Sequence, residues 1–330
     1  MNVNHEISPS SPVRRLDRVM WMSVAITERE IVPSEVIAPA VVTNAIQMAS
    51  GFLTLMKPEI TLMVMISAGV SFLMASDSIS LALLMHTIFG TGLVAAGAAA
   101  LNQFMERVLD GKMRRTSKRP LPAGRLTPTT ALIFGISLAV AGTIYLIYFL
   151  NSLTALLGLF TLFSYLFVYT PLKRKTRFCT LVGAFPGAAP ILIGWAAARN
   201  NLGLAAWALY ATLFLWQFPH FYAIGWLYRE DYGRAGLFML PAVDDDNGRG
   251  TFRAILISTQ LLVVASVVPT FIAHGGYLYF LLATILGLSF YYIAYRGSLS
   301  RSKSAAKTLL HASVIYLPLL YLAMLLDKFK

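Results

Sequence analysis

The sequence predicts an all-α membrane protein, a polytopic bundle of about nine transmembrane helices. Of its 330 residues, 57% are hydrophobic and only 13% are charged, and the mean hydropathy of +0.66 is too high for a pair of soluble domains. Uncharged apolar runs of ~20 residues, the length that crosses ~30 Å of hydrocarbon, recur from about Ile60 to the C-terminus. Lipid hydrocarbon offers no hydrogen-bond partners, so a spanning segment must satisfy its backbone groups within a helix or a closed β-barrel. A β-barrel would show short segments of alternating polarity, so helices are expected here.

The first 50 residues are expected to form a mobile N-terminal extension, with the membrane domain in residues 51–330. Basic, acidic, proline and serine residues are mixed in the extension, and its apolar run 19–26 is too short for a signal-peptide core with a cleavage site. The predicted spans then follow in order as residues 60–76, 81–106, 128–149, 152–170, 179–198, 203–227, 252–272, 276–295 and 306–326.

Lys and Arg residues test this count, because they collect in loops on one side of a membrane. Loop 107–126 holds seven of them, and loops 173–177, 229–253 and 296–307 hold four each, whereas Arg199 is the single basic residue between spans on the other side. This places the N-terminus inside and the C-terminus outside. Membrane orientation therefore accounts for the net charge of +12 without a nucleic-acid partner. Anionic lipid head groups or phosphorylated ligands are the expected partners of these basic loops.

Small residues add two expectations about packing and chemistry. Glycines in 90–97 and 183–194 predict close helix approach within the bundle. Cys179 is the only cysteine, which excludes a disulfide framework and a cysteine-rich metal site.

The end of the second span carries the most informative pattern in the chain. Asn102, Glu106 and Asp110 are spaced four residues apart, so on a helix they form one stripe of oxygen-bearing side chains. Acids at membrane depth are costly unless they face a cavity, a partner or a cation. Oxygen ligands suit Mg²⁺, which takes one or two carboxylates and fills its other positions with water and substrate phosphate oxygens. The guanidinium groups of Arg115 and Arg119, just beyond, have the geometry to hold a diphosphate.

The alternative is a structural one, in which Glu106 and Asp110 form ion pairs at the membrane interface. Arg107, Lys112 and Arg114 are the candidate partners along the same helix. On this reading the stripe needs no ligand, so a second site is required to support a catalytic role.

The sixth span ends in a second polar segment on the same predicted face. Glu230 and Asp231 lie there, four spans after the stripe, which suggests two pseudo-repeated halves around one central cavity. Carboxylates from both halves could hold metal on a diphosphate. The alternative is that they pair with Arg229 and Arg234 in a solvated loop.

Three further features have both a functional and a structural interpretation. His220, beside Pro219, could ligate haem iron or act as a base, but a lone histidine in a bundle is more often a satisfied hydrogen-bonding residue. Lys173 and Arg174 could bind phosphate or only enforce topology. Residues 244–246, all aspartates, are interpreted as a solvated turn.

These segments resemble the UbiA superfamily of intramembrane prenyltransferases over roughly residues 50–327. Asn102, Glu106 and Asp110 match its first motif, and the stretch from Arg115 to Pro122 is similar to its basic stretch. The segments Tyr169 to Arg174, Trp216 to Phe221 and Arg229 to Tyr232 resemble the haem-prenylating branch of the superfamily. The second superfamily motif is only partly present, as Glu230 and Asp231, so the resemblance does not fix the number of metal ions.

The resemblance implies transfer of a farnesyl group from farnesyl diphosphate to a vinyl group of haem b, giving haem O. It implies Mg²⁺ as cofactor, a bacterial inner membrane as location with the mitochondrial inner membrane as alternative, and haem A synthase or oxidase assembly proteins as partners. The implied metal ligands are Asn102, Glu106, Asp110, Glu230 and Asp231, and the implied diphosphate-binding residues are Arg115, Lys118, Arg119, Lys173, Arg174 and Arg229. His220 is the implied haem-binding residue.

Three other functions are weighed against this one. Prenylation of an aromatic or quinone precursor would satisfy the same general motifs. A cation-coupled transporter would place its acids near the membrane midplane, whereas these lie at span ends. A haem electron-transfer protein would need paired histidines on facing spans, and only His86, His220 and His311 fall within spans.

Overall fold

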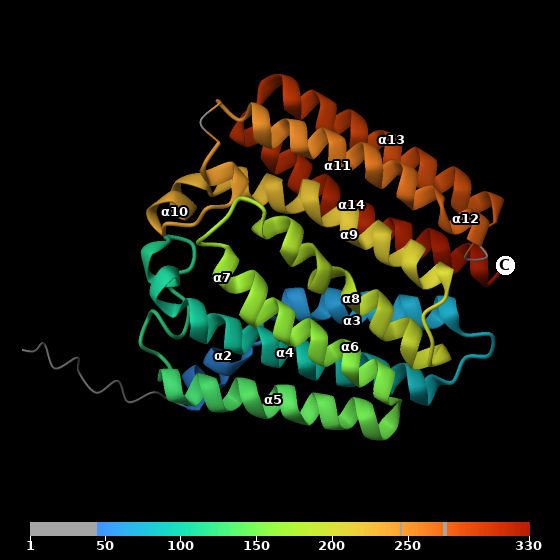
Figure 1. Cartoon of the computed structure of the whole chain (residues 1–330), viewed down its shortest axis with the longest axis horizontal. Helices are drawn as coiled ribbons and strands as arrows, with labels where there is room; N and C mark the ends of the chain where they lie inside the picture. Colours follow the sequence, from blue (N-terminus) through green and yellow to red (C-terminus); the bar gives the residue numbers. More distant parts are fainter. Residues whose placement is uncertain (1–44, 245, 273–275) are drawn as a thin grey trace, which may run out of the picture. The chain divides into compact units, whose positions relative to one another are not determined.

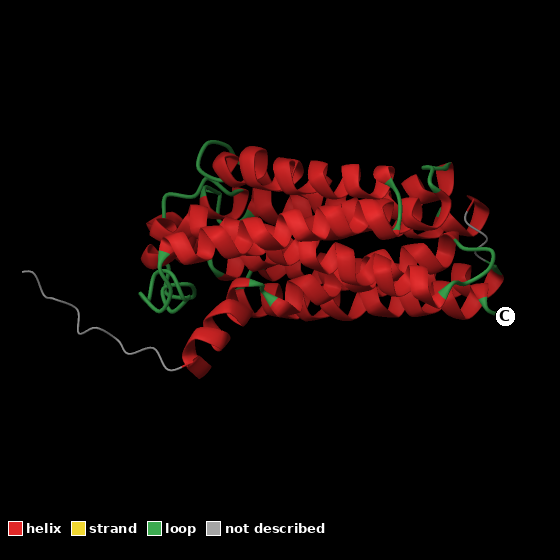
Figure 2. Cartoon of the chain, turned by 90° about the horizontal axis from the view of Figure 1, so that it is seen from below, coloured by secondary structure: helices red, strands yellow, loops and turns green. Residues whose placement is uncertain are grey.

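The computed structural model describes residues 45–244, 246–272 and 276–330, and every regular element in these ranges is a helix (Figure 2). The expected N-terminal extension lies outside the described residues as far as residue 44. Its last residues, 45–50, begin the helix α2 (Ala45–Leu55). Figure 2 shows this helix leaving the bundle at an angle to the others.

Nine long helical segments of the described chain occupy the nine predicted spans. They are α3 (Pro58–Ala75), α4 (Leu81–Lys112), α5 (Pro128–Phe149), α6 (Ser152–Phe163) continued by η1 (Ser164–Tyr169) and α7 (Thr170–Leu172), α8 (Cys179–Arg199), α9 (Leu204–Leu227), α11 (Arg249–Val267) with α12 (Pro269–Ile272), α13 (Tyr277–Ser300) and α14 (Lys303–Lys328). Eight of these segments are long and apolar enough to cross a membrane. The other, α9, has 24 residues but includes Gln217 and His220. The chain is a multi-pass membrane protein.

Polar residues set the starts of four of the long helices by accepting a hydrogen bond from a free backbone N–H of the first turn. Ser80 caps α4, Thr127 caps α5, Asn151 caps α6 and Ser302 caps α14. These caps explain why helices whose first turns are apolar or uncharged, as in α4, α5 and α6, nevertheless begin at defined positions.

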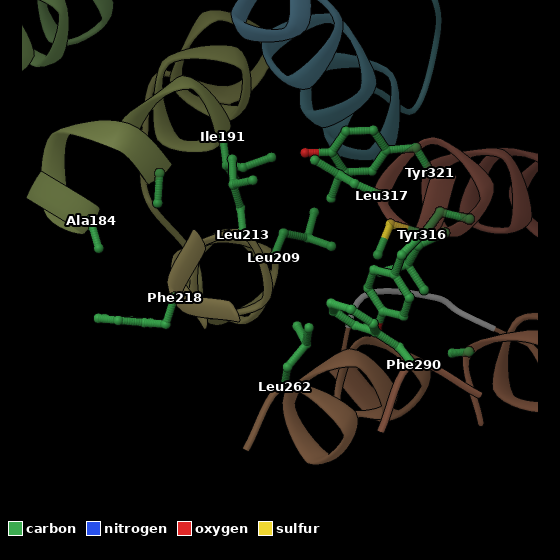
Figure 3. Packing of buried hydrophobic residues seen from close by; sticks show 14 of the residues in the cluster. Ala184, Ile191, Leu209, Leu213, Phe218, Leu262, Phe290, Tyr316, Leu317 and Tyr321 are labelled. Carbon is green, nitrogen blue, oxygen red and sulfur yellow. The ribbon is translucent and has the colours of Figure 1, made fainter. Parts of the chain in front are cut away.

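The helices pack in two groups. In the first, α4 contacts α3 and α5, and α6 contacts α5 and α8; in the second, α11 contacts α9 and α13, and α14 contacts α9 and α13 (Figure 1). The groups are joined where α8 meets α9 and where α14 meets α3. Figure 3 shows the second core, in which Leu209 and Leu213 of α9 lie among Ile191 of α8, Leu262 of α11 and Leu317 of α14.

Glycines allow α4 to approach α5 closely, and α8 to approach α3, as the sequence predicts. A Cβ at Gly97 would lie 2.6 Å from the backbone nitrogen of Ala139 on α5, and one at Gly194 would collide with the carbonyl of Ala68 on α3. The backbones therefore approach more closely than side chains would permit.

The four basic loops meet at one end of the bundle, which we call the basic end (Figure 1, left). The N–H of Phe238 donates to the carbonyl of Lys173 at 2.7 Å, the indole of Trp226 donates to the carbonyl of Arg301 at 3.1 Å, and the backbone of Arg115 reaches Asp231. The shared face predicted from the positions of Lys and Arg is therefore confirmed.

Candidate active site

The predicted stripe lies on one buried face of α4 at the basic end. Asn102, Glu106 and Asp110 are 0%, 9% and 1% exposed. The helix continues to Lys112 and ends where the N–H of Met113 bonds the carbonyl of Asp110. The last three turns of this long helix therefore hold all three oxygen-bearing side chains in register.

Each member of the stripe is bonded to a cation from a different segment. The ammonium of Lys57 donates to Oδ1 of Asn102 at 2.9 Å, and that of Lys173 to Oε1 of Glu106 at 2.8 Å. Nη1 of Arg119 lies 2.8 Å from both carboxylate oxygens of Asp110. We call these six residues the polar rim. Three chain segments converge here because buried carboxylates require charged partners.

The local partners considered in the structural alternative lie elsewhere. The guanidinium of Arg107 donates to the carbonyl of Phe104 and lies over that ring, and Lys112 and Arg114 are exposed. Glu106 and Asp110 are thus held by residues distant from their own helical turn.

A turn of π-helix, residues 164–169, aims the next segment at the stripe. It is followed by Thr170, whose hydroxyl accepts from Nδ2 of Asn102 at 3.2 Å and donates to the carbonyl of Tyr165 at 2.9 Å. Such turns often occur at functional sites. Burial alone would lower the pKa of Lys173, but the Glu106 carboxylate raises that pKa well above its ordinary value, so this ammonium stays charged.

Lys57 is a rim residue that the sequence analysis did not find. It adopts a left-handed conformation, with φ of 48°, between α2 and α3. The amide of Gln103 holds this turn by donating to the carbonyls of Thr54 and Leu55 at 3.1 and 2.9 Å. Burial, assisted by the charge of Arg119, lowers the pKa of Lys57 to about 7. The sequence feature that could have identified it is a lysine directly before a proline at the basic end of the first span.

A cavity of about 400 Å³ adjoins the rim where α2 and α3 meet α4. Its lining combines the polar side chains of Lys57, Gln103 and Arg119 with the apolar side chains of Leu53 and Ile60. The lining also includes Glu59, so charged and apolar groups share this cavity.

The second acidic segment meets the first through the loop after α4. Asp231, in the short helix α10 (Arg229–Arg234), is 8% exposed and accepts from the N–H of Arg115 at 3.4 Å. It also pairs with Arg234, as the structural alternative for this residue proposed. The guanidinium of Arg115 lies 4.5 Å from the ring centre of Tyr228.

Glu230 is not brought together with these residues. Its side chain is 65% exposed and pairs with Lys303 at 2.8 Å. Successive residues of a helix point about 100° apart, so only one of two adjacent acids can face the rim.

The remaining predicted diphosphate-binding residues lie at the basic end without touching the stripe. Lys118 and Arg174 are exposed, and the guanidinium of Arg229 lies 4.1 Å from the ring centre of Trp226. The first of the three aspartates, Asp244, accepts from the N–H and hydroxyl of Thr251 and so caps α11.

His220 lies away from the rim, about 11 Å along α9 from the end of that helix. Its Nδ1 is 2.8 Å from the hydroxyl of Ser313 on α14, and its ring stacks on that of Trp216 with centres 4.6 Å apart. The hydrogen-bonded state expected of a lone histidine is present, and its second ring nitrogen is available for another role.

The rim and α10 offer carboxylate and amide oxygens, the ligand type that Mg²⁺ prefers. Among the described residues, no three His, Cys, Asp or Glu side chains converge as a protein-only metal site would require. Mg²⁺ needs fewer, because one or two carboxylates suffice when phosphate oxygens and water complete its shell. The buried carboxylates of Glu106 and Asp110, one helical turn apart, fit that requirement.

Relatives that match most of this chain share a common name. The model of the UbiA prenyltransferase family matches residues 62–317. A protein of Solibacter usitatus named protoheme IX farnesyltransferase is 49% identical over 84% of this chain and 98% of its own length. Proteins of the same name from Koribacter versatilis and Salinibacter ruber are each 42% identical, over 83% and 84% of this chain and 92% and 98% of their own lengths.

Solved structures share the fold. One, described as digeranylgeranylglyceryl phosphate synthase, superposes with a TM-score of 0.71 at 18% identity, over 86% of this chain and 99% of that chain. A UbiA homologue of Archaeoglobus fulgidus, bound to GPP and Mg²⁺, superposes with a TM-score of 0.62 at 14% identity, over 83% of this chain and 99% of that chain. The chain therefore belongs to the UbiA prenyltransferase family and, within it, to the family of the protoheme IX farnesyltransferases.

Proposed function

We propose that this chain transfers a farnesyl group from farnesyl diphosphate to a vinyl group of haem b, giving haem O. The observation that carries the proposal is the identity of 49% with a protoheme IX farnesyltransferase over nearly the whole length of that relative. The polar rim supports the diphosphate half of the reaction, because it gathers three cations around buried oxygen ligands at the end of an apolar bundle.

The rim and its neighbours would hold the diphosphate. Arg119 and Lys173 pair with the two carboxylates, Lys57 bonds the amide of Asn102 on the same stripe, and the backbone of Arg115 links this loop to α10. Lys118, Arg174 and Arg229 surround them at the same end and would act mainly through their charge. Guanidinium groups suit this role because they bind phosphate oxygens in pairs.

Asn102, Glu106, Asp110 and Asp231 are the proposed metal-binding residues. Glu230 is left out because its side chain is exposed and paired with Lys303. The metal, Mg²⁺ in the A. fulgidus homologue, would supply charge neutralisation of the leaving diphosphate. These side chains would then orient the diphosphate with its first prenyl carbon toward the apolar interior.

The reaction breaks the bond between farnesyl C1 and the diphosphate oxygen, and the electron pair leaves with the diphosphate. The rim cations stabilise that charge as it develops. The π electrons of the haem vinyl group form the new carbon–carbon bond, and water adds to the resulting cation and loses a proton. Exclusion of water from the apolar interior until that step prevents simple hydrolysis of the farnesyl diphosphate.

His220 is the proposed contact to the haem. It lies on α9 at membrane depth, about two helical turns from α10, so a porphyrin beside it would lie deeper than the rim. We further propose that the host is a bacterial inner membrane, with the basic end cytoplasmic. Haem A synthase or oxidase assembly proteins are the proposed consumers of the product.

The test is an assay of purified full-length protein in detergent with Mg²⁺, farnesyl diphosphate and haem b, analysed by mass spectrometry. Haem O is the expected product. A parallel reaction replaces haem b with 4-hydroxybenzoate. Product from the benzoate and none from haem would refute the acceptor while retaining the prenyltransferase class.

A further inference from the structure

We infer that Ser313 fixes the tautomer of His220, so that Nδ1 carries the proton and the lone pair of Nε2 is the one offered to the haem. Ser313 is thus a positioning residue on α14 for a ligand on α9. The inference rests on the proposed function only where it names the haem. The tautomer itself follows from hydrogen bonds within the chain.

The proton count of the Ser313 hydroxyl decides the direction of its bonds. Its Oγ lies 2.7 Å from the carbonyl oxygen of Leu310 and 2.8 Å from Nδ1 of His220. A carbonyl can only accept, so the single hydroxyl proton goes to Leu310. The remaining lone pairs of Oγ can only accept, and Nδ1 must therefore be the donor, whether the imidazole is neutral or charged.

The imidazole is also held in orientation. It stacks on the indole of Trp216, one helical turn earlier, at an interplanar angle of 21°. That indole in turn donates to the carbonyl of Ser313 at 2.9 Å. Ser313 is completely buried, so both rings are bonded to or stacked against one buried site on the facing helix.

The other ring nitrogen is uncommitted. Within the described ranges, Nε2 of His220 forms no hydrogen bond, whereas Nδ1 is occupied. In the neutral imidazole a proton on Nδ1 leaves the lone pair on Nε2, which is the form that binds iron. A hydrogen bond to the distal nitrogen that orients the ring is the usual support for a metal-binding histidine.

The tautomer can be measured without haem. Nitrogen NMR of the full chain in detergent, with ¹⁵N-histidine labelling and assignment by a His220→Gln variant, separates the two tautomers. We expect the Nδ1–H form in the wild type and a mixture in Ser313→Ala. Ser258→Ala is the matched control, because Ser258 also donates to a helix carbonyl but has no histidine partner. An Nε2–H signal in the wild type, or an unchanged spectrum in Ser313→Ala, would overturn the inference.

The consequence for binding is measured by titrating haem b and following the Soret band. Ser313→Ala should raise the Kd for haem by about 10- to 100-fold. Ser313→Thr, which keeps the hydroxyl, should restore most of the affinity and so separates loss of the bond from loss of folding. An unchanged Kd in Ser313→Ala would overturn the role toward haem. Failure of the wild type to make haem O despite haem binding would overturn the proposed function instead.

Discussion

Replacing Lys57 with arginine should remove a pH dependence from the binding of the prenyl diphosphate. Burial, with the nearby charge of Arg119, lowers the pKa of Lys57 to about 7, so about half of the free protein carries a neutral amine there at neutral pH. A bound diphosphate favours the charged ammonium and raises this pKa. Binding therefore takes up a proton above pH 7, and the affinity falls as the pH rises.

The size of the effect follows from the strength of the new bond. A hydrogen bond to a charged group contributes ~1.5–3 kcal/mol. At ~1.36 kcal/mol per pKa unit, this raises the pKa of Lys57 by about one to two units on binding. The Kd should then be constant well below pH 7 and increase by about 5- to 25-fold between pH 7 and pH 9.

The assay is calorimetric titration with Mg²⁺ and a farnesyl thiodiphosphate that is not turned over, from pH 7 to pH 9. Phosphate groups titrate near pH ~6, below this window. Lys57→Arg, which stays charged, should bind with a nearly flat pH profile, and Lys57→Met should bind weakly at every pH. Lys175→Met, which alters an exposed lysine of the same end, is the control. A wild-type slope in Lys57→Arg would refute the assignment of the titrating group.

Three other substitutions test separate parts of the structure. Asp110→Asn should lower turnover by at least about 100-fold while the protein still elutes as a folded species, and wild-type turnover would remove its metal role. Glu230→Gln should leave turnover and melting temperature unchanged, because this side chain is exposed. Gly194→Ala should destabilise the fold by ~1–3 kcal/mol in a denaturant titration, because the new methyl group collides with the carbonyl of Ala68. Wild-type stability of that variant would contradict the close approach of α3 and α8.

The spans could be predicted because each is long and apolar, and because charged loops separate them at the basic end. Residues 128–149 are the clearest case, since the predicted and observed limits coincide. The helices α2 and α10 were not predicted. Both are short, and an isolated helix of that length is marginal, so the contacts that support them are tertiary. The bond from Arg115 to Asp231, which anchors α10, spans 116 residues of sequence.

The residues of the site also divide into those that local sequence predicts and those that depend on tertiary contacts. A spacing of four residues is enough to place Asn102, Glu106 and Asp110 on one face, since it reflects helix geometry alone. Which cation meets which acid depends on how distant segments fold back. The partner of Glu106 is 67 residues away, and Lys57 meets Asn102 across 45 residues. No local pattern carries that information, which explains why Lys57, between α2 and α3, was missed.

The charges of the rim support its assignment to a metal diphosphate rather than to a permanent structural cluster. Three cations, Lys57, Lys173 and Arg119, face two buried carboxylates, which leaves one positive charge in excess when all are ionised. A prenyl diphosphate carries about three negative charges, so with one Mg²⁺ it brings about one negative charge in excess. The complex would be close to neutral, which a low-dielectric site favours. The depressed pKa of Lys57 fits this account, because burial of the ammonium, and then the nearby charge of Arg119, are unfavourable until the anion arrives.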